Sequence, residues 1–220
     1  MSYDSTEIFD ENNDEWQKIN SIIINETKPV DIDSNIINID YTQDSFKTIP
    51  LTPPNNNLLT VSVAESITAG ALSNTLCSEP GSSKFFLGGI IAYNMETQEK
   101  ILGVDAEYAE KNNFANPFTT YSMAKNVSDM FQSRIGISTT GFSLPTFRPA
   151  DLEKGLCEIN VTTPYAYICL YDSLKETYKI YKITNGEYIA NTNDKLQRAQ
   201  MQVKVALACK KIFEEYCMLF

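Results

Sequence analysis

The chain has 220 residues and no histidine, which excludes a Ser-His-Asp triad, a Cys-His dyad and every histidine-ligated metal site. Its net charge of −10 is uneven, because residues 1–57 carry 11 acidic and 3 basic residues whereas residues 58–220 carry 17 and 15. No cluster of Lys and Arg is present to bind phosphates, and the acidic segment would be repelled by an anionic membrane. We therefore expect binding neither to nucleic acid nor to a membrane, and no metal site.

The first residues contain neither the basic region nor the apolar region of a signal peptide. The five cysteines include no CxxC pair, and most lie in apolar runs. This pattern is typical of buried, reduced thiols, so we expect a cytoplasmic or nuclear protein.

Residues 1–57 form an acidic extension that ends in a Pro- and Asn-rich linker at 50–57. Within it, residues 14–24 could form a helix with Trp16 on its apolar face, and residues 35–41 could form a short added strand. Two alternatives remain open for this segment. It docks on the main domain or on a protein partner, or it is a mostly disordered tail.

The main domain is expected over residues 58–220, where strand and helix patterns alternate. The predicted strands cover 58–64, 88–93, 135–140, 165–171 and 178–184. The predicted helices cover 67–77, 96–102, 105–111, 118–134 and 194–218, with a short helical turn at 82–86 and a long loop at 142–162. This alternation predicts a three-layer α/β domain.

Two turns rich in small and hydroxyl residues stand where a strand and a helix meet. They are AESITAG at 64–70 and PGSS at 80–83, and such turns can place N–H and hydroxyl groups around a small anion. Structural roles are equally open for these residues. Ser66 can simply cap a helix, Ser82 and Ser83 can cap a short helical turn, and Tyr93 can be a core residue at a strand end.

The order and spacing of these motifs resemble the CinA C-terminal family, the nicotinamide-nucleotide amidases also called competence-damage proteins. The resemblance covers residues 58–220 and is carried by Ala64–Gly70, Pro80–Tyr93, Leu102–Val104, Thr140–Pro145, and Arg198 with Gln200. It implies a three-layer α/β/α sandwich with a mixed sheet and no cofactor. It also implies hydrolysis of the carboxamide of nicotinamide mononucleotide, which yields nicotinate mononucleotide and ammonia.

The resemblance assigns roles to individual residues. It implies that Ser83 is the nucleophile, that Tyr93 assists it, and that the Thr140 hydroxyl lies near the oxyanion. The ligand-binding residues that it implies, or that the two turns supply, are Glu65, Ser66, Thr68, Ser82, Gly141 and Arg198.

Gln98 departs from the family pattern, because it stands where the resemblance implies the general-base lysine, five residues after Tyr93. A neutral amide cannot take a proton from serine, and the loss of a general base typically costs about 10²- to 10⁴-fold in rate. Lys100 is expected to point away on its helix, and Lys84 is expected to be a solvated surface residue. The family's glycine-rich loop is also replaced, by the bulkier residues at 146–149.

We therefore expect a catalytically impaired family member that acts as a binding or interaction module. The alternative is an active amidohydrolase with a relocated lysine. The expected partners are a pyridine nucleotide or another anion in the pocket, a protein that binds residues 1–57, and further copies of the chain in a homo-oligomer.

Overall fold

The computed structural model describes residues 59–184 and 194–219. The chain divides into two units, Met1–Ile49 and Pro50–Phe220, and all of the described residues belong to the second. The expected helix at 14–24, the expected strand at 35–41 and the linker at 50–57 lie outside the described residues, so these expectations stay predictions.

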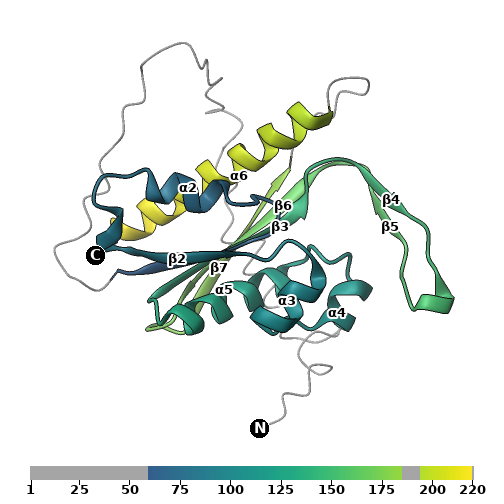
Figure 1. Ribbon diagram of the computed structural model, residues 1–220, viewed down its shortest axis with the longest axis horizontal. Coiled ribbons are helices and arrows are strands. Elements are labelled where there is room, and N and C mark those ends of the chain that lie inside the picture. Colours follow the sequence, from purple (N-terminus) through teal and green to yellow (C-terminus); the bar gives the residue numbers. More distant parts are fainter. Residues whose placement is uncertain (1–58, 185–193, 220) are drawn as a thin grey trace, which may run out of the picture. The chain divides into compact units, whose positions relative to one another are not determined.

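A mixed five-stranded sheet with the strand order β2-β1-β3-β6-β7 forms the centre of the described domain (Figure 1). Strands β1, β2 and β3 run parallel, whereas β6 and β7 are antiparallel to their neighbours. The bounds are Val61–Glu65 for β1, Phe86–Ile91 for β2, Ile135–Phe142 for β3, Tyr165–Asp172 for β6 and Thr177–Thr184 for β7. The two predicted hairpin strands at 165–171 and 178–184 correspond to β6 and β7.

Helices cover both faces of this sheet, which confirms the predicted three-layer α/β/α sandwich. Figure 1 shows α2 and α6 on one face and α3, α4 and α5 on the other. The bounds are Ala71–Cys77 for α2, Met95–Leu102 for α3, Ala106–Lys111 for α4, Pro117–Phe131 for α5 and Asp194–Cys217 for α6. Along α6 the buried residues Met201, Val205, Cys209 and Phe213 recur every four positions, so one stripe of the helix packs inward.

Asparagine and aspartate side chains begin three of these helices. Asn94, Asp105 and Asn116 each accept a hydrogen bond from the backbone N–H three residues later. This is the N-cap arrangement, which satisfies a helical N–H that has no partner within the helix. At its other end α5 stops at Phe131, where Gln132 takes a left-handed conformation with φ of 53°. The predicted extension of this helix to residue 134 is therefore wrong.

The central strands β1 and β3 form the floor of the core. All of β1 is buried, and α5 lies so close to β3 that a Cβ on Gly136 would be 1.9 Å from the Ala124 carbonyl oxygen. On the α5 side, Ala64 packs with Met123 and Val127. This tight contact between helix and strand holds the ends of β1 and β3 in fixed positions.

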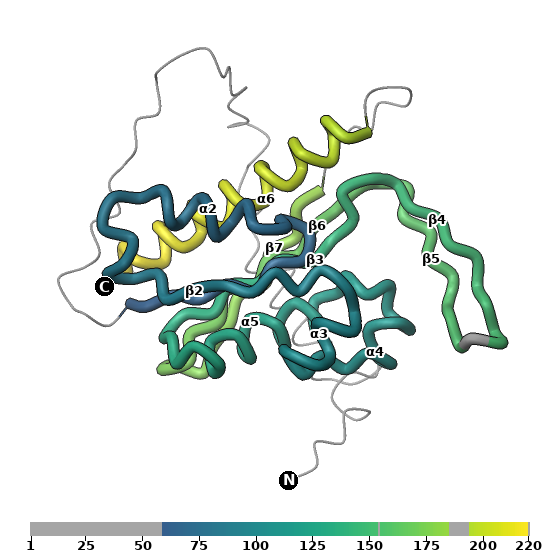
Figure 2. The backbone as a smooth tube through the Cα atoms, in the orientation of Figure 1, coloured from purple at the N-terminus to yellow at the C-terminus, as the bar shows by residue number. Residues whose placement is uncertain are grey.

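The predicted loop at 142–162 is wrong, because it contains a two-stranded arm. Strands β4 (Thr146–Arg148) and β5 (Ile159–Val161) pair antiparallel and extend away from the main sheet (Figure 2). The Arg148 guanidinium donates to the Cys157 carbonyl at 2.8 Å and also bonds Glu110 on α4. Strands of three residues carry too little periodicity to be recognised in a sequence, so only these long-range contacts reveal the arm.

Candidate functional site

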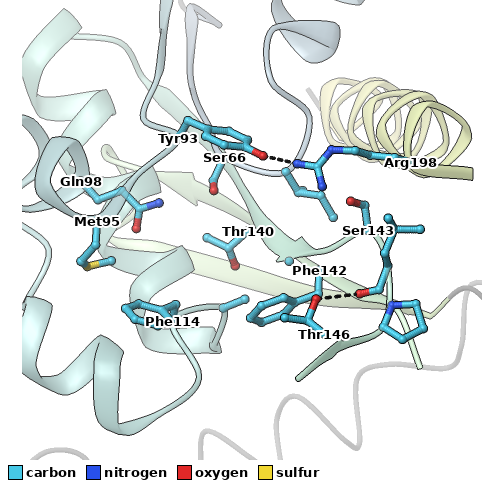
Figure 3. Close-up of a pocket in the computed structure, with 15 residues that line it drawn as sticks. Ser66, Tyr93, Met95, Gln98, Phe114, Thr140, Phe142, Ser143, Thr146 and Arg198 are labelled. Atoms are coloured by element: carbon cyan, nitrogen blue, oxygen red, sulfur yellow. Dashed lines mark hydrogen bonds between the residues drawn. The ribbon is translucent and has the colours of Figure 1, made fainter. Parts of the chain in front are cut away.

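A pocket of about 520 Å³ lies where the carboxyl ends of the three parallel strands meet. Ser66 follows β1, Tyr93 follows β2, and Thr140 and Gly141 lie near the end of β3, while Arg198 comes from α6 (Figure 3). Parallel strands end at the same edge of a sheet, which is the usual position of a ligand site in an open α/β fold. The lining also includes the apolar residues Ile67, Met95, Phe114, Phe142 and Leu144.

Arg198 and Tyr93 form the cationic end of the pocket. The Arg198 guanidinium donates to the Tyr93 hydroxyl oxygen and lies 5.9 Å from the centre of its ring. Because the tyrosine oxygen accepts this hydrogen bond, its own proton remains available to a ligand. Several guanidinium N–H groups remain available as well. This end of the pocket is therefore suited to a phosphate or a carboxylate.

Thr140 presents an acceptor rather than a donor to the pocket. The Thr120 hydroxyl donates to the Asn116 carbonyl at 2.7 Å, which uses the only hydroxyl proton of Thr120. The 2.7 Å contact between the hydroxyls of Thr120 and Thr140 must then be donated by Thr140. The lone pairs of the Thr140 oxygen are left for the ligand. This arrangement suits an amide N–H better than the developing oxyanion that the resemblance implies.

Gln98 is fixed at the inner wall of the pocket. Its side chain is buried, and its Nε2 donates to the Ala92 carbonyl at 2.9 Å. A carbonyl can only accept, so the amide nitrogen faces Ala92 and the amide oxygen is left for other contacts. Asn94 caps the start of α3, the helix that carries Gln98. Gln98 can therefore bind a donor group of a ligand, but it cannot carry a proton away from a nucleophile.

Gly141 is required by the close approach of the neighbouring strand. A Cβ at this position would be 2.3 Å from the Tyr165 carbonyl oxygen and 2.8 Å from the Ile67 Cδ1 atom. The neighbouring strand is β6, and its Tyr165 hydroxyl donates to the Ala115 carbonyl at 3.0 Å. Burial, with a smaller effect of Tyr167, raises the pKa of Tyr165 to about 12, so this hydroxyl remains a donor at neutral pH.

Ser143 and Phe114 are among the lining residues that the sequence did not predict. Ser143 is buried and lies against the pocket, within the stretch that carried the family resemblance. Phe114 has a left-handed φ of 56°, directly after Asn113 at 61°, and such conformations are uncommon for large side chains. Arg148 lies 5.3 Å from the centre of the Phe114 ring, so the arm contacts the wall of the pocket. No local sequence signal indicates this contact.

Ser83 and Ser82 lie outside the pocket. They belong to the short 3-10 turn Ser82–Lys84, which precedes β2, whereas Tyr93 follows β2. Six residues of extended strand span roughly 20 Å. Ser83 is exposed, and the Ser82 hydroxyl donates to the Cys77 carbonyl at 3.2 Å. Within one chain, the expected nucleophile therefore cannot reach Tyr93 or the Gln98 position.

Glu65 and Thr68 also point away from the pocket. The buried Glu65 carboxylate accepts the N–H groups of Gly70 at 2.9 Å, Leu72 at 3.0 Å and Ser73 at 2.7 Å. It thereby caps α2, which begins at Ala71, so the predicted helix start at residue 67 with Ser66 as its cap is wrong. The Thr68 hydroxyl bonds the Thr139 hydroxyl at 2.8 Å inside the core.

The described lining of the pocket supplies no general base. Among the described residues that line it, none is Lys, Asp, Glu or Cys. Lys100 pairs with Glu96 at 2.5 Å on the exposed face of α3, and Lys84 lies in the turn that carries Ser83. The described residues also contain no group of three or more Cys, Asp and Glu side chains that could hold a metal ion. Serine chemistry in this pocket would need a base from elsewhere.

The cysteines meet the expectation of buried thiols only in part. All five cysteines are free, although only Cys169 and Cys209 are fully buried and Cys77 is exposed. Among the residues with described structure, no helix is both long enough and apolar enough to cross a bilayer.

The comparison with known families and the comparison with solved structures agree with each other. The model of the family described as "CinA C-terminal domain" matches residues 52–177. A crystal structure of a competence-damaged protein (CinA) superfamily protein from Klebsiella pneumoniae superposes with a TM-score of 0.53 at 18% identity, over 74% of this chain and 89% of the other. The competence/damage inducible protein CihA from Agrobacterium tumefaciens gives 0.54 at 20% identity, over 70% and 85%.

The curated sequence relatives are much longer than the segment that aligns with this chain. A CinA-like protein from Flavobacterium psychrophilum is 35% identical over 106 residues, which is 48% of this chain and 25% of that protein. The chain thus spans about a quarter of the length of the curated relatives it matches. The solved structures are less than 25% identical and therefore support the fold alone.

Proposed function

Because this chain belongs to the CinA C-terminal domain family, we propose that its pocket binds a pyridine nucleotide or a similar aromatic anion without hydrolysing it efficiently. The observation that carries the proposal is the pocket lining, in which the described residues supply one guanidinium group and no general base. A binding module needs the guanidinium group but no general base, whereas an amidase needs both.

The pocket offers complementary surfaces for the parts of such a ligand. Arg198 and Tyr93 supply donors for a phosphate. The apolar wall with Met95, Phe114 and Phe142 can accept a flat ring. The Thr140 and Gln98 oxygens can accept from a carboxamide N–H, as their hydrogen bonds to Thr120 and Ala92 indicate.

Hydrolysis would need groups that this arrangement does not supply. Gln98 is neutral, Lys100 is held by Glu96 on the outer face of its helix, and Ser83 lies at the far end of β2. An unassisted hydroxyl is a weak nucleophile. The second candidate function is an active amidohydrolase, and it is favoured by the convergence of Tyr93, Thr140 and Arg198 on one pocket.

Calorimetric titration tests the binding proposal. Nicotinate mononucleotide and nicotinamide mononucleotide should bind, and the corresponding nucleosides without phosphate should bind more weakly. Arg198→Met should weaken nucleotide binding about tenfold or more, the effect expected for one charged hydrogen bond. Lys211→Met, an exposed residue on the same helix, serves as the control and should leave it unchanged. No binding at millimolar ligand would overturn the proposal.

Release of ammonia from nicotinamide mononucleotide separates the two candidate functions. The wild-type chain should release almost none. Turnover on the order of 1 s⁻¹ that Ser83→Ala abolishes would establish the amidohydrolase instead.

A further inference from the structure

Strand β2 has an unprotected edge. It is outermost in the sheet and pairs with β1 alone among the described strands, and its sequence FLGGII contains no charge and no proline. The other outer strand, β7, carries Lys179 and Lys182, the type of residue with which natural sheets block pairing. One irregularity is present in β2, an extra residue at Leu87, and it leaves Gly88–Ile91 in regular register with β1. A bare edge of this kind is a template for another strand.

The outward side of β2 has the features of a pairing surface. The Ala92 N–H donates inward to the Glu65 carbonyl at 2.8 Å, so by alternation the backbone groups of Gly89 and Ile91 point outward. Large apolar side chains follow the same edge, with Leu87 exposed by 43%, Ile91 by 54% and Tyr93 by 54%. Gly89 at the middle has no side chain to hinder a second backbone.

We propose that β2 pairs antiparallel with β2 of a second copy of this chain, about a two-fold axis at Gly89, and that each copy thereby completes the pocket of the other. A strand that meets itself about a two-fold axis forms a self-complementary interface. In this register Ser83 of the second copy comes opposite Met95, which lines the pocket. Moving the axis by one residue brings Ser83 opposite Tyr93 or Thr97, at the same end of the strand.

Charge complementarity selects a second copy in the antiparallel direction. The exposed Lys84 lies at the amino end of β2. The carboxyl end of β2 is followed on α3 by Glu96, Glu99 and Lys100, which together carry a net charge of −1, with Lys100 paired to Glu96. Antiparallel pairing brings each Lys84 to the acidic helix of the other copy, and it does so twice. A parallel arrangement would place like charges together. The pairing also reunites the PGSS turn with the pocket from which β2 separates it.

The oligomeric state of the full-length chain is the first test, and it needs no ligand. Light scattering during gel filtration should give twice the 24.8 kDa of one chain. Ile91→Lys should give the mass of one chain, because a lysine at the edge blocks pairing. Leu174→Lys makes the same change in charge at an exposed position in the β6–β7 turn and should leave the dimer intact. A monomeric wild-type chain, or a dimer unaffected by Ile91→Lys, would overturn the proposal.

Disulfide formation between mixed variants tests the direction of pairing. In a Cys77→Ser background, which removes the exposed native thiol, Lys84→Cys protein is mixed with Glu96→Cys protein. Mass spectrometry should identify a disulfide between positions 84 and 96 in the mixture and none between identical positions in either protein alone. Disulfides between identical positions would contradict the antiparallel register. Slow hydrogen exchange at the Gly89 and Ile91 amides of a monomer would assign the edge to another segment of this chain and overturn the proposal.

The contribution of the second copy to the pocket rests on the proposed function and is measured separately. Lys84 adjoins Ser83, which the proposed register places opposite the lining residue Met95, so Lys84→Ala should weaken nicotinate mononucleotide binding about tenfold. Lys179→Ala on β7 is the control and should have no effect. If the Lys84→Ala dimer binds the nucleotide as tightly as the wild-type dimer, then the second copy does not contribute to the pocket. A dimer that binds no nucleotide would instead overturn the proposed function and leave the interface standing.

Discussion

Gln98 shows how one side chain limits the chemistry of the pocket. Its amide nitrogen is bonded to the Ala92 carbonyl, and its oxygen has no capacity to carry a proton at neutral pH. The neighbouring Tyr93 and Arg198 are donors, so they do not replace a base. The polar groups of the pocket are therefore matched to holding a ligand.

Replacing Gln98 by lysine tests this limit. Gln98→Lys should raise ammonia release from nicotinamide mononucleotide, because burial disfavours the charged amine and leaves a neutral base that can activate a hydroxyl lining the pocket, such as that of Ser66. A gain of about 10²-fold is the lower end of what general-base catalysis supplies. Gln98→Met has a similar length and no basic nitrogen, and it should show no gain. Unchanged activity in a Gln98→Lys protein that still binds the nucleotide would mean that no nucleophile reaches the pocket.

Glu65 acts on stability rather than on ligands. Its buried carboxylate accepts three N–H groups and the Ser73 hydroxyl at the start of α2. Glu65→Gln replaces one of the two acceptor oxygens by a donor, so it should lower the free energy of unfolding by about 2 kcal/mol. Urea titration measures this loss, and the exposed Glu99→Gln is the control. A clear loss of nucleotide affinity in folded Glu65→Gln would instead show that Glu65 belongs to the binding site.

At the scale of elements, a charged network attaches the last turns of α6 to the sheet. Arg134 donates to both Asp172 oxygens, at 3.3 and 3.1 Å, and the Tyr216 hydroxyl on α6 donates to the same carboxylate. Burial alone would raise the pKa of Asp172. The hydrogen bonds from Arg134, Tyr216 and the backbone of Lys175 and Leu174 outweigh burial and hold this pKa below its usual 3.8.

The lowered pKa of Asp172 predicts a loss of stability in acid. A group with a lowered folded-state pKa stabilises the fold fully above its unfolded value and loses that effect as the pH falls through the folded value. Asp172→Asn should therefore cost about 3 kcal/mol at neutral pH, as expected for breaking a buried pair. The difference from wild type should shrink below about pH 4. Urea titrations of both proteins measure this difference in the free energy of unfolding. They should span about pH 2.5 to 7, on both sides of the carboxyl pKa. A difference that stays constant with pH would contradict the assignment.

At the scale of the whole molecule, the five strands and the helices of the described domain pair with one another within residues 59–219. The acidic extension carries most of the net charge and lies outside the described residues. Because the described elements already pair with one another, deletion of residues 1–57 should change the free energy of unfolding by less than about 1 kcal/mol. Thermal and urea unfolding measure the effect. A loss of several kcal/mol, as expected when a buried apolar face is removed, would show that the extension is part of the core.

The order of elements and the fold class could be predicted from the sequence because they depend on local patterns. Apolar runs at 58–64 and 135–140 and the alternating pair at 165–184 correspond to β1, β3 and the β6–β7 hairpin. Prediction failed where a contact distant in sequence decides the outcome. The start of α2 depends on the Glu65 carboxylate, and the β4–β5 arm depends on Arg148 and Glu110.

The sequence by itself determined which groups are available for chemistry in this protein. It contains no histidine, it has Gln98 in place of a lysine, and its motifs are those of the CinA C-terminal domain family. Only the tertiary structure decided which of those groups meet. Ser66, Tyr93, Thr140, Gly141 and Arg198 come together because parallel strands end at one edge, with α6 alongside. Ser83 of the same chain lies outside this pocket because an extended strand keeps its two ends roughly 20 Å apart, a separation that no motif spacing reveals.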